Sequence, residues 1–150
     1  MTRRCAGFTL IELVTVMILL GILAAVAIPR MANLSDYRAL EFRDRTVSTL
    51  RYAQKTATSH RRRVCIAFTA TTVALTIAKA QGNAAACNEN LALAGATANV
   101  LTSSDTTNAV FTSGHTTTLD FLPDGTGSDR TLTIAGQTPI VVQGATGHVQ

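Results

Sequence analysis

The sequence predicts an α+β fold, in which a long N-terminal helix is packed on a small antiparallel β-sheet domain. Two differences along the chain support this prediction. Residues 8–59 combine an apolar run with helical, amphipathic spacing, whereas Thr, Asn, Gly and Ser dominate the remainder. Apolar residues in that remainder alternate in short runs, as they do in half-buried strands. A length of 150 residues leaves room for one modest core.

The chain begins with a basic segment and an apolar segment. Residues 1–7 contain two arginines and end in a glycine, and residues 8–28 are almost continuously hydrophobic with Glu12 as their one charge. Twenty-one residues rise about 31 Å as a helix, which is enough to cross the hydrocarbon of a bilayer. We therefore expect a transmembrane helix over residues 8–29, and the two arginines favour an N-terminus in the cytoplasm.

Pro29 closes the apolar segment. It removes a helix hydrogen bond to the carbonyl oxygen of Ala25, so we expect a helix kink there that need not end the helix. Residues 30–60 contain no Gly or Pro and show amphipathic spacing. They are expected to continue the helix and to pack on protein. The expected buried stripe consists of Leu40, Val47, Leu50, Ala53 and Ala57.

Residues 61–150 are expected to form the β domain. Alternating apolar residues and turn signals predict strands at 64–68, 73–77, 117–121, 131–135 and 139–143, with a hairpin through 69–72. Residues 79–98 have weak periodicity and are expected to form a long loop. The sheet is therefore expected to be small and antiparallel.

Three cysteines are present, which is an odd number. If residues 1–7 are removed, Cys5 leaves with them, and Cys65 and Cys87 remain as a candidate disulfide. An oxidising compartment favours that bond, and closing the loop between them contributes about 3 kcal/mol in the chain-entropy model. The alternative is a pair of buried free thiols.

The residues from Gly7 to Glu12, GFTLIE, are followed by an unbroken apolar helix. This stretch resembles the processing and methylation signature of type IV prepilins and type II secretion pseudopilins. The resemblance implies a pilin fold, and it implies that a prepilin peptidase cuts between Gly7 and Phe8 and methylates the new amine of Phe8. A glycine at the cut suits this chemistry, because its backbone can enter a confined protease site.

Glu12 becomes the fifth residue of the mature chain under this interpretation. An ionised carboxylate within hydrocarbon costs several kcal/mol unless it is paired. The resemblance implies that its partner is the N-terminal amine of a neighbouring subunit, and that the pair sets the subunit register in a filament. The alternative is a glutamate that reaches the lipid headgroups from the start of the helix.

Further motifs occur downstream, at residues 49–57, 61–65, 121–125 and 146–149. They resemble the GspH/FimT class of minor pilins, which implies a subunit that assembles into or primes a type IV pilus or a type II secretion pseudopilus. The implied partners are the prepilin peptidase, other pilins or pseudopilins and the inner-membrane assembly platform. The implied location is the bacterial inner membrane, crossed once, with a periplasmic C-terminal domain.

Two other functions compete with assembly. A secretory signal peptide cleaved after Ala25-Val26-Ala27 is one, although a charge at Glu12 argues against it. A DNA-binding minor pilin is the other. A basic patch could contact DNA through Arg51, Lys55, Arg61, Arg62 and Arg63, or these residues could form a solvated helix end.

The bulk charge gives little support to DNA binding. The formal net charge is +4, and loss of the first seven residues leaves 11 basic against 9 acidic side chains. The C-terminal stretch of residues 147–150 also lacks the arginines that related DNA-binding minor pilins present. No nucleophile elbow, acid pair or metal-ligand spacing stands out, so we expect neither enzymatic activity nor a cofactor or metal.

Overall fold

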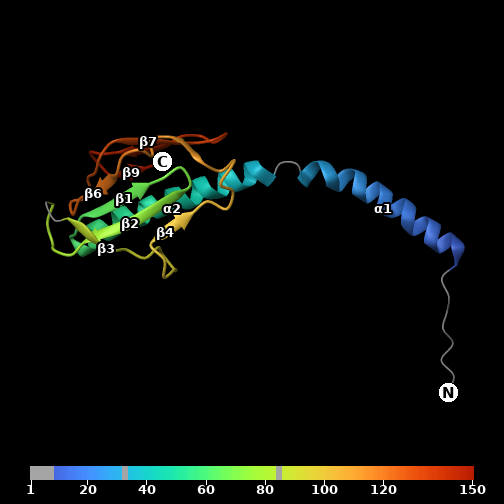
Figure 1. The fold of residues 1–150 in the computed structure, drawn as a ribbon, viewed down its shortest axis with the longest axis horizontal. Coiled ribbons are helices and arrows are strands. Elements are labelled where there is room, and N and C mark those ends of the chain that lie inside the picture. The colour runs from blue at the N-terminus through green and yellow to red at the C-terminus, as the bar shows by residue number, and fades with distance from the viewer. Residues whose placement is uncertain (1–8, 32–33, 84–85) are drawn as a thin grey trace, which may run out of the picture. The chain divides into compact units, whose positions relative to one another are not determined.

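The computed structural model describes residues 9–31, 34–83 and 86–150. It divides the chain into two compact units, Met1–Leu34 and Ser35–Gln150. The first contains helix α1, Leu10–Met31, and the second contains nearly all of helix α2, Leu34–His60, together with the strands (Figure 1). The predicted continuity of the two helices depends on residues 32–33, which lie outside the described residues.

Helix α1 begins directly after Thr9. The backbone amide of Glu12 donates to Thr9 Oγ1 at 3.3 Å, so Thr9 acts as the N-cap of the helix. The helix continues through Pro29 to Met31, and Pro29 therefore does not end it. The kink at Pro29 stays a prediction. Among the described residues, none of the helices has both the length and the apolarity needed to cross a membrane.

Helix α2 buries one stripe, and four of its predicted positions are confirmed: Val47, Leu50, Ala53 and Ala57. The prediction for Leu40 is wrong, because 44% of that residue is exposed. Ala39 and Phe42 are buried in its place. Successive residues of an α-helix are rotated by about 100° around its axis. Leu40 is therefore rotated by about 100° from Ala39 and lies outside the buried stripe.

The strands form two antiparallel sheets. The first has the order β3-β2-β1-β6, and β4 also pairs with β2. Its strands are β1 Val64–Phe68, β2 Thr72–Ala78, β3 Cys87–Asn90, β4 Val100–Thr102 and β6 Leu119–Phe121. The second sheet has the order β5-β7-β8-β9. Its strands are β5 Phe111–Ser113, β7 Arg130–Ile134, β8 Ile140–Gln143 and β9 His148–Val149.

The predicted strands correspond to β1, β2, β6, β7 and β8. The predicted hairpin between β1 and β2 is present, and the amide of Thr69 donates to the carbonyl oxygen of Thr72 at 3.0 Å. The long loop predicted over residues 79–98 is wrong in part, because β3 lies within it. Strand β3 reads CNEN, so it has no apolar alternation, and pairing with β2 is what makes it a strand. Strands β4, β5 and β9 are two or three residues long and give no periodic signal.

Helix α2 and both sheets share one hydrophobic core. Figure 1 shows α2 running along the strands of the first sheet. Leu50 of α2 is fully buried, as are Ile66 of β1 and Leu132 of β7. Phe42 of α2 packs on Phe111 of β5 with ring centroids 5.1 Å apart, so the helix contacts the second sheet as well. This core fixes which side chains of α2 remain exposed.

Leu50→Ala is predicted to lower the free energy of unfolding by about 2–5 kcal/mol, because it leaves a cavity in the shared core. Leu40→Ala on the same helix is the matched control and is predicted to change it by less than about 0.5 kcal/mol. Chemical denaturation of the full chain in detergent measures both. Equal losses for the two variants would contradict the observed position of the buried stripe.

Candidate functional site

The predicted processing residues Gly7 and Phe8 lie outside the described residues. Glu12, the third candidate of this segment, lies in the first turn of α1. Its carboxylate has no hydrogen bond or ion pair with any residue that the structure describes. Thr15 Oγ1 donates to the carbonyl oxygen of Glu12 at 2.9 Å, so only the backbone of Glu12 is engaged on that side.

Apolar side chains surround Glu12 on α1 and are exposed. The large ones between Leu10 and Leu23 are exposed by 41–81%. A contiguous apolar surface of this kind marks a site of contact with protein or lipid. Helix α1 therefore presents an apolar surface that carries a single carboxylate.

Arg51, the first residue of the predicted basic patch, contacts the C-terminal strand. Its Nε and Nη2 donate to the carbonyl oxygen of Val149 at 3.2 and 3.0 Å. Gln54, one turn later, donates from Nε2 to the carbonyl oxygens of Thr146 at 2.9 Å and Gly125 at 3.3 Å. The two side chains thus fasten α2 to backbone near the end of the chain. The sequence did not single out Gln54. Its position beside the buried stripe is the available signal, because a long polar side chain there can reach the backbone of a neighbouring segment.

The three consecutive arginines at the end of α2 have separate surroundings. Arg61 has a φ of 52° and ends the helix, and the amide of Arg62 donates to the carbonyl oxygen of Ala57 at 3.1 Å, as in a Schellman motif. Arg62 Nη1 lies 3.9 Å from a carboxylate oxygen of Glu89. The last of the three, Arg63, belongs to a different network and faces Asp120.

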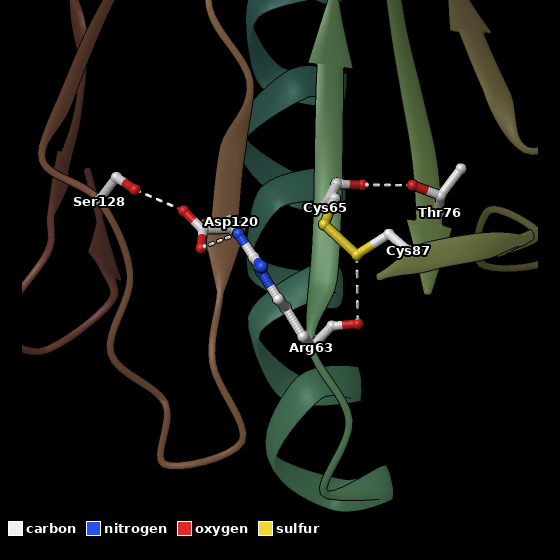
Figure 2. The surroundings of a disulfide bond; sticks show 6 residues. All are labelled: Arg63, Cys65, Thr76, Cys87, Asp120 and Ser128. Carbon is white, nitrogen blue, oxygen red and sulfur yellow. Dashed lines mark hydrogen bonds and ion pairs between the residues drawn. A yellow bond between two sulfur atoms is a disulfide. The ribbon is translucent and has the colours of Figure 1, made fainter. Parts of the chain in front are cut away.

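Asp120 of β6 joins three segments of the domain. Arg63 Nη2 lies 2.9 Å from Asp120 Oδ2, and Ser128 Oγ donates to Asp120 Oδ1 (Figure 2). Arg51, Arg62 and Arg63 therefore all have partners within the chain. Among the described residues, Lys55 and Arg61 have no ion-pair partner.

The predicted disulfide between Cys65 and Cys87 is present, with Cα atoms 6.0 Å apart (Figure 2). Cys65 lies in β1 and Cys87 begins β3, so the bond joins two strands that flank β2. The register between β2 and β3 shifts between Ile77 and Ala78, where Cys87 approaches. Cys87 Sγ lies 3.6 Å from the carbonyl oxygen of Arg63, a contact rather than a hydrogen bond because a disulfide sulfur has no proton. The prediction that Cys87 lies in a loop is wrong.

Two aspartates have lowered pKa values, and both hold turns. Hydrogen bonds from Asn108, with one from the Thr107 amide, lower the pKa of Asp105 to about 2. Hydrogen bonds from the hydroxyl and amide of Thr126 lower the pKa of Asp124. Both carboxylates are therefore ionised near neutral pH, whereas a general acid needs a raised pKa. Within the described ranges, no cluster of three or more His, Cys, Asp or Glu could hold a metal.

Two hollows lie beside α2. One has a volume of about 190 Å³ and is lined by Tyr52, Leu93 and Leu101 among others. The other has a volume of about 250 Å³ and lies near Asp36 and Asn108. Ser35 and Asp36 both line the second hollow, but no hydrogen bond joins their side chains, so neither hollow shows a nucleophile paired with a base.

Two family models match this chain. The prokaryotic N-terminal methylation motif matches residues 2–28, and the type II transport protein GspH matches residues 44–147, which is more than half of the chain. The chain belongs to the GspH family. The predicted pilin fold and the predicted resemblance to this class are thereby confirmed, and GspH is a family of structural subunits.

One relative of this GspH family member is named type IV narrow pilus major component PilA5, from Thermus thermophilus. It is 44% identical over 55 residues, which are 37% of this chain and 47% of that protein. The chain thus spans about half of the relative's length. No solved structure matches the chain significantly.

Replacing both cysteines, Cys65→Ser/Cys87→Ser, is predicted to cost about 3 kcal/mol of unfolding free energy, because the unfolded chain regains the freedom of the closed loop. Chemical denaturation measures the loss, and non-reducing peptide mapping should find the two cysteines linked in the unsubstituted protein. Cys5→Ser is the matched control and should change neither result. Two free thiols, or an unchanged unfolding free energy, would refute the structural role of this bond.

Proposed function

We propose that this protein is a minor pilin or pseudopilin, a structural subunit of a type IV pilus or a type II secretion pseudopilus. In this proposal the prepilin peptidase cuts between Gly7 and Phe8 and methylates Phe8, and the subunit then joins or primes the filament. The observation that carries the proposal is the exposed apolar surface of α1 with Glu12 in its first turn. Membership of the GspH family supports it.

In this proposal the subunit is anchored in the inner membrane before it joins a filament. The N-terminus lies in the cytoplasm, residues 8–29 form the span, and the domain that contains α2 and the sheets lies in the periplasm. Moving α1 from lipid into a filament of similar helices exchanges one apolar environment for another, so little hydrophobic free energy opposes the transfer. The assembly platform acts on subunits held in this way, and a kink at Pro29 adjusts the direction of the chain.

Glu12 provides the specificity that apolar contacts lack. A carboxylate within an apolar bundle is costly unless a cation lies beside it. The methylated amine of Phe8 from a neighbouring subunit supplies that cation, and only one axial register brings the two groups together. The narrow-pilus component from Thermus thermophilus, by its name a pilus subunit, is consistent with such an assembly.

Glu12→Ala is predicted to leave membrane insertion and cleavage intact but to reduce incorporation into filaments at least about tenfold, because the register-setting charge is lost. Val16→Ala, on the same helix, is the matched control and should incorporate normally. Quantitative immunoblots of sheared filaments measure incorporation, and mass spectrometry checks that each mature chain begins at N-methyl-Phe8. Normal incorporation of Glu12→Ala would show that this carboxylate only reaches the headgroups.

DNA uptake is the alternative function, and we predict that DNA binding is weak. Arg62 and Arg63 have carboxylate partners and Arg51 donates to the Val149 carbonyl oxygen, so Lys55 and Arg61 are the two candidate cations without a partner among the described residues. Two contacts imply a slope of only about −1.8 for log affinity against log salt on duplex DNA. Fluorescence titration of the full chain in detergent measures that slope, with Lys79→Glu as a control. Tight binding at physiological salt that Lys55→Ala/Arg61→Ala abolishes would favour a DNA receptor over a scaffold.

A further inference from the structure

The first hollow beside α2 has apolar walls on the side of the sheet. Leu93, Ala94 and Ala96 line it from the loop between β3 and β4, and Leu101 lines it from β4 itself. The amide of Leu93 donates to the carbonyl oxygen of Ala98 at 2.8 Å, so this loop is closed by its own backbone. An apolar cavity of about 150 Å³ can hold a benzene molecule. The volume of about 190 Å³ found here is therefore enough for one aromatic or large aliphatic side chain.

Helix α2 adds polar groups to the same hollow. Thr49 and Tyr52 line it, and within the described part of the chain their hydroxyl groups form no hydrogen bond. A partly buried tyrosine hydroxyl usually finds a partner. Arg45 also lines the hollow and lies 3.4 Å from Glu41, in an exposed pair that another acceptor can replace. The hollow thus combines apolar walls with two hydroxyls and one cation.

Strand β4 lies beside β2 at the margin of the first sheet and has an open edge (Figure 1). Asn99 and Ser103 each form a backbone hydrogen bond of 2.9 Å with the segment that contains β2, and Leu101 pairs with β2 between them. Alternate residues of an antiparallel strand direct their backbone groups to opposite edges. Val100 and Thr102 therefore direct two N–H and two C=O groups away from β2. Within the described ranges, no other strand pairs with this edge.

This edge lacks the features that usually protect a sheet edge. Charged side chains, proline or a bulge normally prevent the addition of another strand. Residues 90–104 contain no charged residue and no proline. Val100 is 37% exposed and Thr102 is also exposed, and both are β-branched residues that favour strands. The edge of β4 is therefore suited to receive one more strand.

The open edge and the hollow select the same register for an added strand. Leu101 is only 2% exposed and faces the hollow, whereas its neighbours Val100 and Thr102 face the other side of the sheet. A residue directly opposite Leu101 on an added antiparallel strand has its Cβ about 4.5–5.5 Å from that of Leu101, on the same face. Its side chain therefore enters the hollow while the backbone pairs with β4.

We propose that β4 and this hollow bind an extended segment of a partner protein. The segment adds to β4 as an antiparallel strand, inserts one aromatic or large aliphatic side chain beside Leu101, and places an acidic side chain near Arg45. The occupant is a peptide, because only an extended backbone matches two donors and two acceptors at the spacing of a strand. The named strands of this chain are already paired within their own sheets, so a separate protein supplies the segment. This binding is additional to the assembly proposed for α1.

Two short peptides test the hollow. The fluorescein-labelled peptide TVTFTET presents its valine, phenylalanine and glutamate on one face when extended, and TVTDTET replaces the phenylalanine with aspartate. Fluorescence anisotropy with the full chain in detergent measures both affinities. We expect TVTFTET to bind and TVTDTET to bind at least about tenfold more weakly, because a carboxylate is costly to bury in an apolar hollow. Equal affinities, or no binding of either peptide, would overturn the proposal.

Protein variants test the edge and the hollow separately. Val100→Pro removes an outward N–H and leaves the bonds to β2 in place, so it should weaken binding of TVTFTET about fivefold or more. Val100→Thr keeps the amide and is the matched control. Ser48→Phe fills the hollow from α2 and should also weaken binding, whereas Ser59→Phe, at an exposed serine outside the hollow, should not. Circular dichroism checks that each variant is folded.

Two other results would overturn strand addition by a partner. Loss of binding in Ser48→Phe without any loss in Val100→Pro would show that the hollow takes an apolar group with no added strand. A dimer of the chain that Val100→Pro abolishes and that TVTFTET does not dissociate would show that the edge pairs with a second copy. Sedimentation velocity detects such a dimer. All these measurements use the dispersed chain, so their outcome does not depend on assembly into a filament.

Discussion

Burial of one stripe of α2 is the constraint on which the rest of the domain depends. Leu50, Ala53 and Ala57 contribute no exposed surface, and they belong to one core with buried side chains of both sheets. A helix that buries one stripe must leave the opposite side chains outside, so the same packing that stabilises the core also sets the outward face. Ala53 and Ala57 are fully buried, so larger side chains at these positions would overpack the core.

Two short strands that bury few apolar side chains are held by other contacts. Strand β9 has two residues, and its carbonyl at Val149 is held by Arg51. Strand β3 has no large apolar residue, and the Cys65–Cys87 bond ties its start to β1. A polar contact and a disulfide therefore hold these two strands in place, whereas apolar burial stabilises the centre of the domain.

Helix α1 differs from α2 in the exposure of its apolar side chains. Its apolar side chains are exposed rather than buried, so they require a surrounding of lipid or of other helices. In the assembly proposed above, the carboxylate of Glu12 distinguishes one arrangement of helices from the others, because apolar contacts alone tolerate sliding.

Local sequence patterns were enough to predict part of this structure. Helical spacing located four of the five predicted buried positions of α2, alternation located β1, β2, β6, β7 and β8, and the apolar run with Glu12 indicated a pilin. Three features could be seen only once the chain was folded: Leu40 is exposed, Cys87 begins a strand, and the strands divide into two sheets. The contacts of Arg51, Arg62 and Arg63 with Val149, Glu89 and Asp120 could not be predicted either, because these partners lie far away in the sequence. Periodicity reports which face of an element is apolar, and long-range pairing depends on where other elements bring their backbone and charges.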